Sequence, residues 1–123
     1  MEAVILRDPS YDELMKFIME DKTDEEEYFD PYYPKCYAYN LLAEIFLRRA
    51  AQQGLKGHLI LLEREGPHSY WWIVGIETTD RGWFYLWPNI DQEVKLEIGK
   101  GYYEANNLYS SDPDPKIVRI IVF

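Results

Sequence analysis

Cysteine is almost absent from this chain: Cys36 is the only one among 123 residues. A single thiol excludes an internal disulfide framework and is typical of a reducing compartment. Only two histidines are present, His58 and His68, and with one distant cysteine they do not make a standard set of zinc ligands. The seven glycines are scattered without the spacing of a phosphate-binding loop. We therefore predict no metal site and no cofactor.

Long apolar runs and basic residues are also scarce. No stretch approaches the length of a membrane-spanning helix, and no basic segment followed by an apolar run opens the sequence. The chain has 13 Lys and Arg against 22 Asp and Glu, so its formal net charge is −9 at pH 7. Such a charge disfavours binding to nucleic acid and to anionic lipid surfaces. We predict a cytoplasmic protein that binds neither nucleic acid nor membranes.

Aromatic residues, by contrast, are abundant: the chain has 11 Tyr, 4 Trp and 5 Phe. With 47% apolar residues, this composition is that of a folded globular protein. The length suffices for one modest core, so residues 1–123 are predicted to form a single domain. The tryptophans are most simply packing residues, and the alternative is a flat aromatic platform for a ligand or partner. They are Trp71, Trp72, Trp83 and Trp87.

The first helical pattern covers Tyr11–Glu20. Ser10 and Glu13 have the spacing of a capping box, in which each side chain bonds to the backbone N–H of the other residue. An acidic stretch follows, and its carboxylates are Glu20, Asp21, Asp24, Glu25, Glu26, Glu27 and Asp30. A calcium loop needs a glycine at its sharp turn, and this stretch has none. We interpret it as a solvated acidic loop.

The second helical pattern is longer and runs from Tyr37 to Gln53, just ahead of Gly54. Ala43 and Ala50 fall on its apolar face, where small side chains allow a helix to lie close against a sheet. Gly54 suits the left-handed conformation that often ends a helix. We expect this segment to be the central and most buried helix.

After Gly54 the apolar residues alternate, as is typical of strands. Asp80-Arg81-Gly82 suits a three-residue hairpin loop with glycine in the left-handed position. The predicted strands are His58–Glu63, Ser69–Glu77, Gly82–Trp87, Glu93–Ile98 and Lys116–Phe123. Two helices followed by strands imply an α+β fold with an antiparallel sheet of four or five strands.

Cys36 stands directly before the second helical pattern. At a helix start, backbone N–H groups and the helix dipole favour the thiolate over the thiol. A cysteine nucleophile also needs a histidine base that is held by a third group, commonly a carboxylate. The strands that follow should then supply these two groups. The alternative is that Cys36 is a small buried residue without reactivity.

In order and in sequence, these features resemble the transglutaminase-like superfamily, and its small single-domain members most of all. The resemblance covers most of the chain, from the first helix to the last strand. It includes Cys36 followed by Ala43, and Gly82-Trp83 at the start of a later strand. The other similar segments are Gly54-Leu55-Lys56-Gly57, Glu77-Thr78-Thr79-Asp80-Arg81-Gly82, the stretch from Tyr85 through Pro88 to Gly99-Lys100, and Tyr102-Tyr103.

The resemblance implies a papain-like core, in which a helix with the cysteine at its N-terminus packs on an antiparallel sheet. It places the nucleophile at Cys36. Counted from the 77–82 hairpin, the histidine position falls on Trp71 rather than His68, and the family's spacing puts the acid position at Trp87. The chain therefore departs from the family pattern at two of three catalytic positions. With an odd number of residues in the hairpin loop, residues 71 and 87 share one face of the sheet.

Indole cannot replace imidazole in this role. A neutral imidazole accepts the thiol proton through its lone pair, whereas the indole N–H only donates. An unassisted thiol with a pKa near ~8.5 is only a few per cent ionised at neutral pH. We therefore favour a pseudoenzyme that keeps the fold as a binding or structural module for a protein or peptide partner. In this hypothesis Trp71, Trp87 and Tyr37 line the former cleft.

The alternative hypothesis is a cysteine-dependent hydrolase or acyltransferase that acts on an amide or peptide bond with Cys36 and His68. In a regular strand His68 points to the face opposite Trp71. The enzyme hypothesis therefore needs a bulge near Ser69 or Tyr70, a feature that is common beside active sites. Otherwise His68, which follows Gly-Pro, is a surface residue of a turn.

Overall fold

The computed structural model of the chain describes residues 4–22, 39–67, 69–88, 92–109, 111 and 113–123. Its elements are α1 (Tyr11–Glu20), α2 (Tyr39–Gln52), β1 (His58–Arg64), β2 (Tyr70–Thr78), β3 (Gly82–Trp87), β4 (Gln92–Val94), α3 (Tyr102–Ala105) and β5 (Ile117–Val122). The strands form one open antiparallel sheet of five strands in the order β4-β3-β2-β1-β5. The predicted α+β class with an antiparallel sheet is confirmed.

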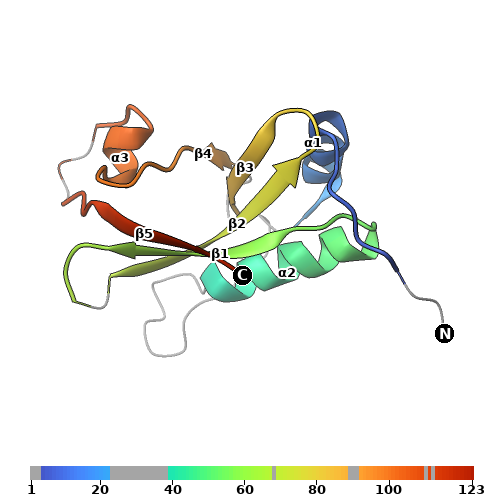
Figure 1. Cartoon of the computed structure of the whole chain (residues 1–123), viewed down its shortest axis with the longest axis horizontal. Helices are drawn as coiled ribbons and strands as arrows, with labels where there is room; N and C mark the ends of the chain where they lie inside the picture. Colours follow the sequence, from blue (N-terminus) through green and yellow to red (C-terminus); the bar gives the residue numbers. More distant parts are fainter. Residues whose placement is uncertain (1–3, 23–38, 68, 89–91, 110, 112) are drawn as a thin grey trace.

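Strand side chains alternate between the two sides of this sheet, and apolar ones are buried on each side. α2 packs on one side, which we name the α2 face, and there Val74 of β2 shares a buried cluster with Ala43 and Phe46. α1 joins the same cluster through Leu14 and Ile18. α3 lies on the opposite side, the α3 face (Figure 1). The buried cluster of the α3 face consists of Ile60, Leu62, Ile73, Trp87, Val94 and Ile117.

Both long helices have the local signals that the sequence predicts. The Ser10 hydroxyl oxygen accepts a hydrogen bond from the Glu13 N–H at 3.1 Å, and the Glu13 carboxylate accepts one from the Ser10 N–H at 3.2 Å, so the capping box is confirmed. α2 buries Ala43 and Ala50 as expected. Gly54, just beyond its end, has a φ of 77°, which confirms the left-handed C-terminal glycine.

The β2–β3 hairpin is present, but its loop lies one residue earlier than predicted. Thr78 pairs with Gly82, which opens β3 with a φ of 70°, so the loop comprises residues 79–81. The buried Thr78 hydroxyl donates to the Gly82 carbonyl at 2.7 Å and accepts from the Arg81 N–H at 3.0 Å. The loop still has an odd number of residues, so the side chains of β2 and β3 share the faces that the sequence predicts.

The strand predicted over Glu93–Ile98 is wrong beyond Val94. The side chain of Asn106 bonds both backbone groups of Lys95: its oxygen accepts from the Lys95 N–H at 2.7 Å, and its amide donates to the Lys95 carbonyl at 3.0 Å. These bonds replace the ladder, and the chain leaves the sheet to form α3. α3 was not predicted, and the N–H groups of Tyr103 and Glu104 in it donate to the Asp114 carboxylate.

The Arg7–Glu13 pair makes stability depend on acidity. The side-chain hydrogen bond from Arg7 lowers the pKa of Glu13 from 4.5 to about 2, and the Ser10 N–H assists. Because the folded-state pKa is the lower one, the pair stabilises the protein above about pH 4.5 and loses this effect as the pH falls towards 2. In urea unfolding, the difference in unfolding free energy between wild type and Glu13→Gln should shrink over this range.

Arg7→Gln is the matched control, because it removes the other half of the pair and should abolish the same part of the pH dependence. Both effects should weaken in high salt, since the pair is exposed. A difference between wild type and Glu13→Gln that stays constant from pH 5 to 2 would contradict this account.

Candidate functional site

Trp71 on β2 and Trp87 at the end of β3 pack against each other. Their ring centroids are 4.9 Å apart with an interplanar angle of 82°, an edge-to-face arrangement. Tyr102 of α3 closes the group, with its ring 5.7 Å from Trp71 and 5.3 Å from Trp87. The expectation that residues 71 and 87 share a face is therefore confirmed.

The Trp71 ring also has a cationic neighbour. The guanidinium carbon of Arg64 lies 3.7 Å from the centroid of this ring, a cation–π arrangement. Burial lowers the pKa of Arg64, while the Asp114 carboxylate opposes that shift. Arg64 Nε is buried and has no hydrogen-bond partner among the described residues. Trp71 is thus held between Arg64 and the two neighbouring rings, and it serves as packing.

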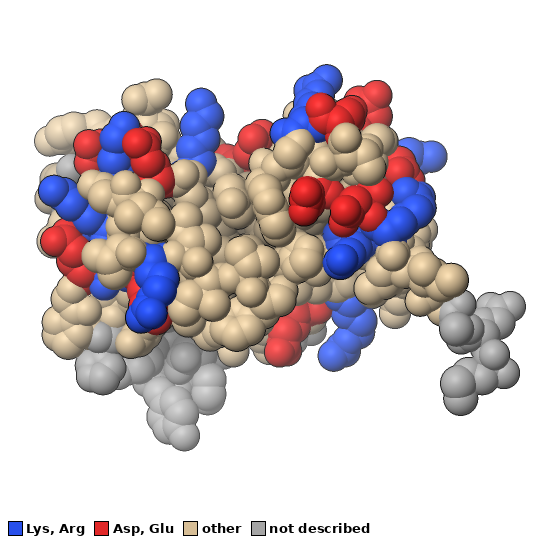
Figure 2. All heavy atoms as spheres, in the orientation of Figure 1, with Lys and Arg blue, Asp and Glu red and all other residues tan. Residues whose placement is uncertain are grey.

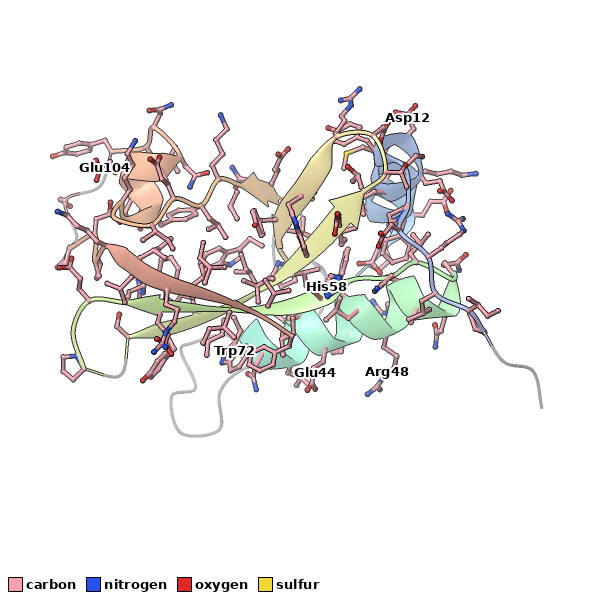
Figure 3. The ribbon with its side chains drawn as sticks, viewed as in Figure 1. Asp12, Glu44, Arg48, His58, Trp72 and Glu104 are labelled. Carbon is pink, nitrogen blue, oxygen red and sulfur yellow. The ribbon has the colours of Figure 1, made fainter. Side chains whose placement is uncertain are left out.

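The Trp71–Trp87 pair belongs to the α3 face, and α2 lies on the opposite side of the sheet. The next residue of β2, Trp72, points to the α2 side, as Val74 does (Figure 3). Two catalytic positions at 71 and 87 would consequently not face α2. The other predicted site residues, Cys36, Tyr37 and His68, lie outside the described residues.

A second aromatic group lies beside this pair and is open to solvent. Trp83 is 39% exposed, and its ring is nearly parallel to that of Tyr85, with an interplanar angle of 8° and centroids 6.0 Å apart. The His58 ring of β1 lies 5.2 Å from Trp83. These three residues share the α3 face, because His58 pairs with Gly75 and Glu77 pairs with Trp83. We call His58, Trp83 and Tyr85 the aromatic shelf.

Gly75 makes the shelf possible. It lies between His58 and Tyr85 in the register of the sheet. A Cβ atom at this position would lie 2.9 Å from the Cγ1 and Cδ1 atoms of Ile60 and 3.3 Å from Cζ3 of Trp83. The missing side chain therefore lets the Trp83 indole extend across β2 towards His58.

A shallow hollow of about 360 Å³ borders the shelf. Its lining combines the two aromatic rings with carboxylates and aliphatic groups: Trp83, Tyr85, Glu93, Val94, Lys95, Leu96, Glu97 and Ala105. Burial raises the pKa of the Tyr85 hydroxyl, which keeps it neutral at physiological pH. The ion pair of Glu97 with Lys100, at 3.0 Å, lies at the rim. The hollow is suited to a ligand group that contacts an aromatic ring and a carboxylate together.

A larger hollow, of about 680 Å³, lies between α1 and the end of α2. Its lining is polar and includes Glu13, Lys16 and Gln52. The side chain of Asp21 is only 2% exposed there, but Arg49 lies 3.8 Å away and both residues have further partners. We therefore assign these charges to the joining of α1 and α2.

On the side of the shelf away from its hollow, uncharged residues continue to the sheet edge at β5. Figure 2 shows an uncharged band across the middle of the molecule, between groups of charged side chains at its two ends. Val122 pairs with Ile60 at the sheet edge, so it lies on the α3 face, and it is 47% exposed. The Phe123 ring instead lies 6.0 Å from that of Trp72, on the α2 side. The His58 Nδ1 atom lies 3.1 Å from the Phe123 carbonyl oxygen and connects the shelf to the end of β5.

No protein-family model, curated protein or solved structure matched this chain. Among the described residues, no group of three or more His, Cys, Asp and Glu is arranged to hold a metal ion. Within the same part of the chain, every helix is too short or too polar to cross a bilayer.

Trp87 and Trp83 should differ strongly in their effect on stability. Trp87 is 9% exposed within the Trp71–Tyr102 group, and its truncation to alanine should cost about 3–5 kcal/mol through the cavity that it leaves. Trp83→Ala, at an exposed position, should cost roughly 1 kcal/mol. Urea unfolding of the two variants measures this, and equal losses would contradict the division into packing and exposed aromatics.

Gly75→Ala should destabilise the sheet by about 1–3 kcal/mol, because the new methyl group overlaps the fully buried Ile60. The same substitution in an Ile60→Ala background should cost clearly less, since the clash is relieved. A double-mutant cycle by urea unfolding provides the measurement. Additive effects would show that Gly75 is not required for this packing.

Proposed function

We propose that this chain is a non-catalytic, transglutaminase-like domain that acts as a binding module for a protein or peptide. The observation that carries the proposal is the packing of Trp71 against Trp87 at 4.9 Å. In the resemblance these two positions belong to the histidine and the acid of a triad, whereas here they lie on the side of the sheet away from α2. Here each side chain fills space in the cluster of the α3 face.

Chemistry supports the non-catalytic assignment. An indole N–H donates a hydrogen bond and offers no lone pair to accept a proton, so neither tryptophan is a general base. The Trp71 ring is in contact with Arg64, Trp87 and Tyr102. A triad at these positions would therefore need new side chains and a different packing of the α3 face.

The binding role rests on the aromatic shelf. Exposed tryptophan and tyrosine side chains are enriched where proteins bind partners, because they present a large rigid surface with a polar edge. Trp83 has this character, and the adjoining hollow carries carboxylates within reach. The Trp71–Trp87 pair, which packs against Tyr102 of α3, belongs to the same buried cluster of the α3 face that Tyr85 of the shelf packs against.

Thiol alkylation tests the proposal, because Cys36 is the only cysteine and every labelled molecule reports on it. We expect iodoacetamide to react no faster than with a free thiol, with a midpoint near pH ~8.5 or above. His68→Ala should leave the rate unchanged. Cys36→Ser, which should not label, is the control for specificity.

Rapid alkylation at neutral pH, with a thiol pKa well below that of free cysteine and a loss of rate in His68→Ala, would overturn the non-catalytic assignment. It would instead support a thiol enzyme with a His68 base.

A further inference from the structure

We propose that the aromatic shelf binds the cationic side chain of a lysine or arginine that projects from a basic segment of a partner protein. This inference rests on the proposed function as a binding module and names the chemistry of its partner. It is carried by the geometry of the shelf, by the carboxylates beside it and by the charge of the whole chain.

The rings of the shelf are arranged to receive a cation. Trp83 and Tyr85 are nearly parallel neighbours, and Trp83 is the exposed one. A cation is attracted to the face of such a ring when it lies within about 6 Å of the centroid. The protein already uses this interaction internally, with Arg64 over Trp71 and Arg81 over Tyr11. No described lysine or arginine occupies the ring faces of Trp83 or Tyr85 in the same way.

Carboxylates and cationic side chains both border the shelf, and Arg81, whose guanidinium lies over the Tyr11 ring, shares a second hollow with Trp83 and Glu93. Glu93 and Glu97 line the hollow with one lysine, Lys95, and Glu97 is bound to Lys100 at the rim. The sheet register places the exposed Glu77 directly across from Trp83. Among the described residues, Glu77 and Glu93 have no ion-pair partner, so a cationic group on the indole would have two carboxylates nearby that are not already paired.

The charge of the whole chain selects the same partner. With a formal net charge of −9, the protein repels acidic molecules and attracts basic ones over long range. A local preference for a cation and a global preference for a basic partner thus agree. The uncharged band seen in Figure 2 offers a surface without repelling cations against which the rest of such a segment would lie.

The openness of the shelf favours a side chain of a macromolecule over a free small cation. Small-ligand sites usually enclose about 70–90% of their ligand, which a shallow hollow does not do. Trp83, beside this hollow, is itself 39% exposed. A lysine on a docked segment needs less enclosure, because neighbouring residues contribute contacts. Exposed Val122, which pairs with Ile60 of the α3 face, extends the surface along β5.

The test compares two peptides with the full chain. One is a short basic peptide of alternating lysine, arginine and glycine; the other carries norleucine and citrulline at the basic positions, with nearly the same shape and no charge. Indole fluorescence and the indole N–H resonance of Trp83 report binding. We expect the basic peptide alone to bind, to shift the Trp83 resonance, and to bind more weakly as salt is raised.

Trp83→Ala should weaken binding of the basic peptide about tenfold, the size expected for loss of a partly desolvated cation–π contact. Glu77→Gln and Glu93→Gln, which keep the shape of the shelf, should each weaken it about two- to fivefold at low salt. Tyr70→Ala is the matched control, an exposed aromatic of β2 on the α2 face, and it should bind normally. Unfolding curves of each variant exclude loss of folding as the cause.

Equal binding of the neutral peptide, or full binding by Trp83→Ala, would overturn the inference. Tetramethylammonium binding as tightly as the basic peptide would assign the shelf to free small cations and would also overturn it. If neither peptide binds while Cys36 alkylates as a free thiol, this inference fails and the non-catalytic assignment stands. A His68-dependent reactive thiol would remove the proposed function itself.

Discussion

The burial of β2 on both of its sides is the constraint on which the rest of the structure depends. Four consecutive residues, Ile73 to Ile76, are buried, although neighbouring side chains of a strand point in opposite directions. α2 covers one direction, and the segment from β4 through α3 to β5 covers much of the other. An aromatic or aliphatic side chain on a neighbouring strand therefore belongs to one of two separate clusters, and its register with β2 decides which one. The site follows from that assignment.

Much of this architecture could be predicted from local sequence. The capping box at Ser10, the glycine at the end of α2 and the glycine that opens β3 are short-range signals, and each lies where the sequence puts it. α3 and the early end of β4 could not be predicted. They depend on side-chain bonds between residues about ten positions apart, from Asn106 to Lys95 and from Asp114 to the start of α3. No periodicity in the sequence records such bonds.

Only part of the candidate site could be predicted, because its arrangement depends on which side of the sheet each helix covers. Alternation correctly brought Trp71 and Trp87 to one face, but alternation does not say which face carries α2, because both faces of β2 are apolar. The shelf was predicted only in outline, because the alternative of a flat aromatic platform included Trp83 but neither His58 nor Tyr85. Its available signals were Gly75 inside a buried strand and three aromatic residues at every second position of β3, Trp83, Tyr85 and Trp87. An isolated glycine in a strand marks a close approach of other groups, and here the group is the Trp83 ring.

The aromatic residues in one row on β3 have two different roles. Which role each has depends on whether the segment that contains α3 covers it. Trp87 lies under Tyr102 and is buried, Tyr85 lies at the edge of the covered region, and Trp83 is beyond it. The boundary is set by the two bonds between Asn106 and Lys95, which draw the chain away from β3 after three residues of β4. Had β4 continued as a strand to Ile98, its side chains would run alongside β3 as far as Trp83 and beyond, because the pairing is antiparallel with Val94 opposite Tyr85. The same bonds that end β4 thus keep the shelf open, and the surface available for binding is a direct consequence of how that strand is terminated.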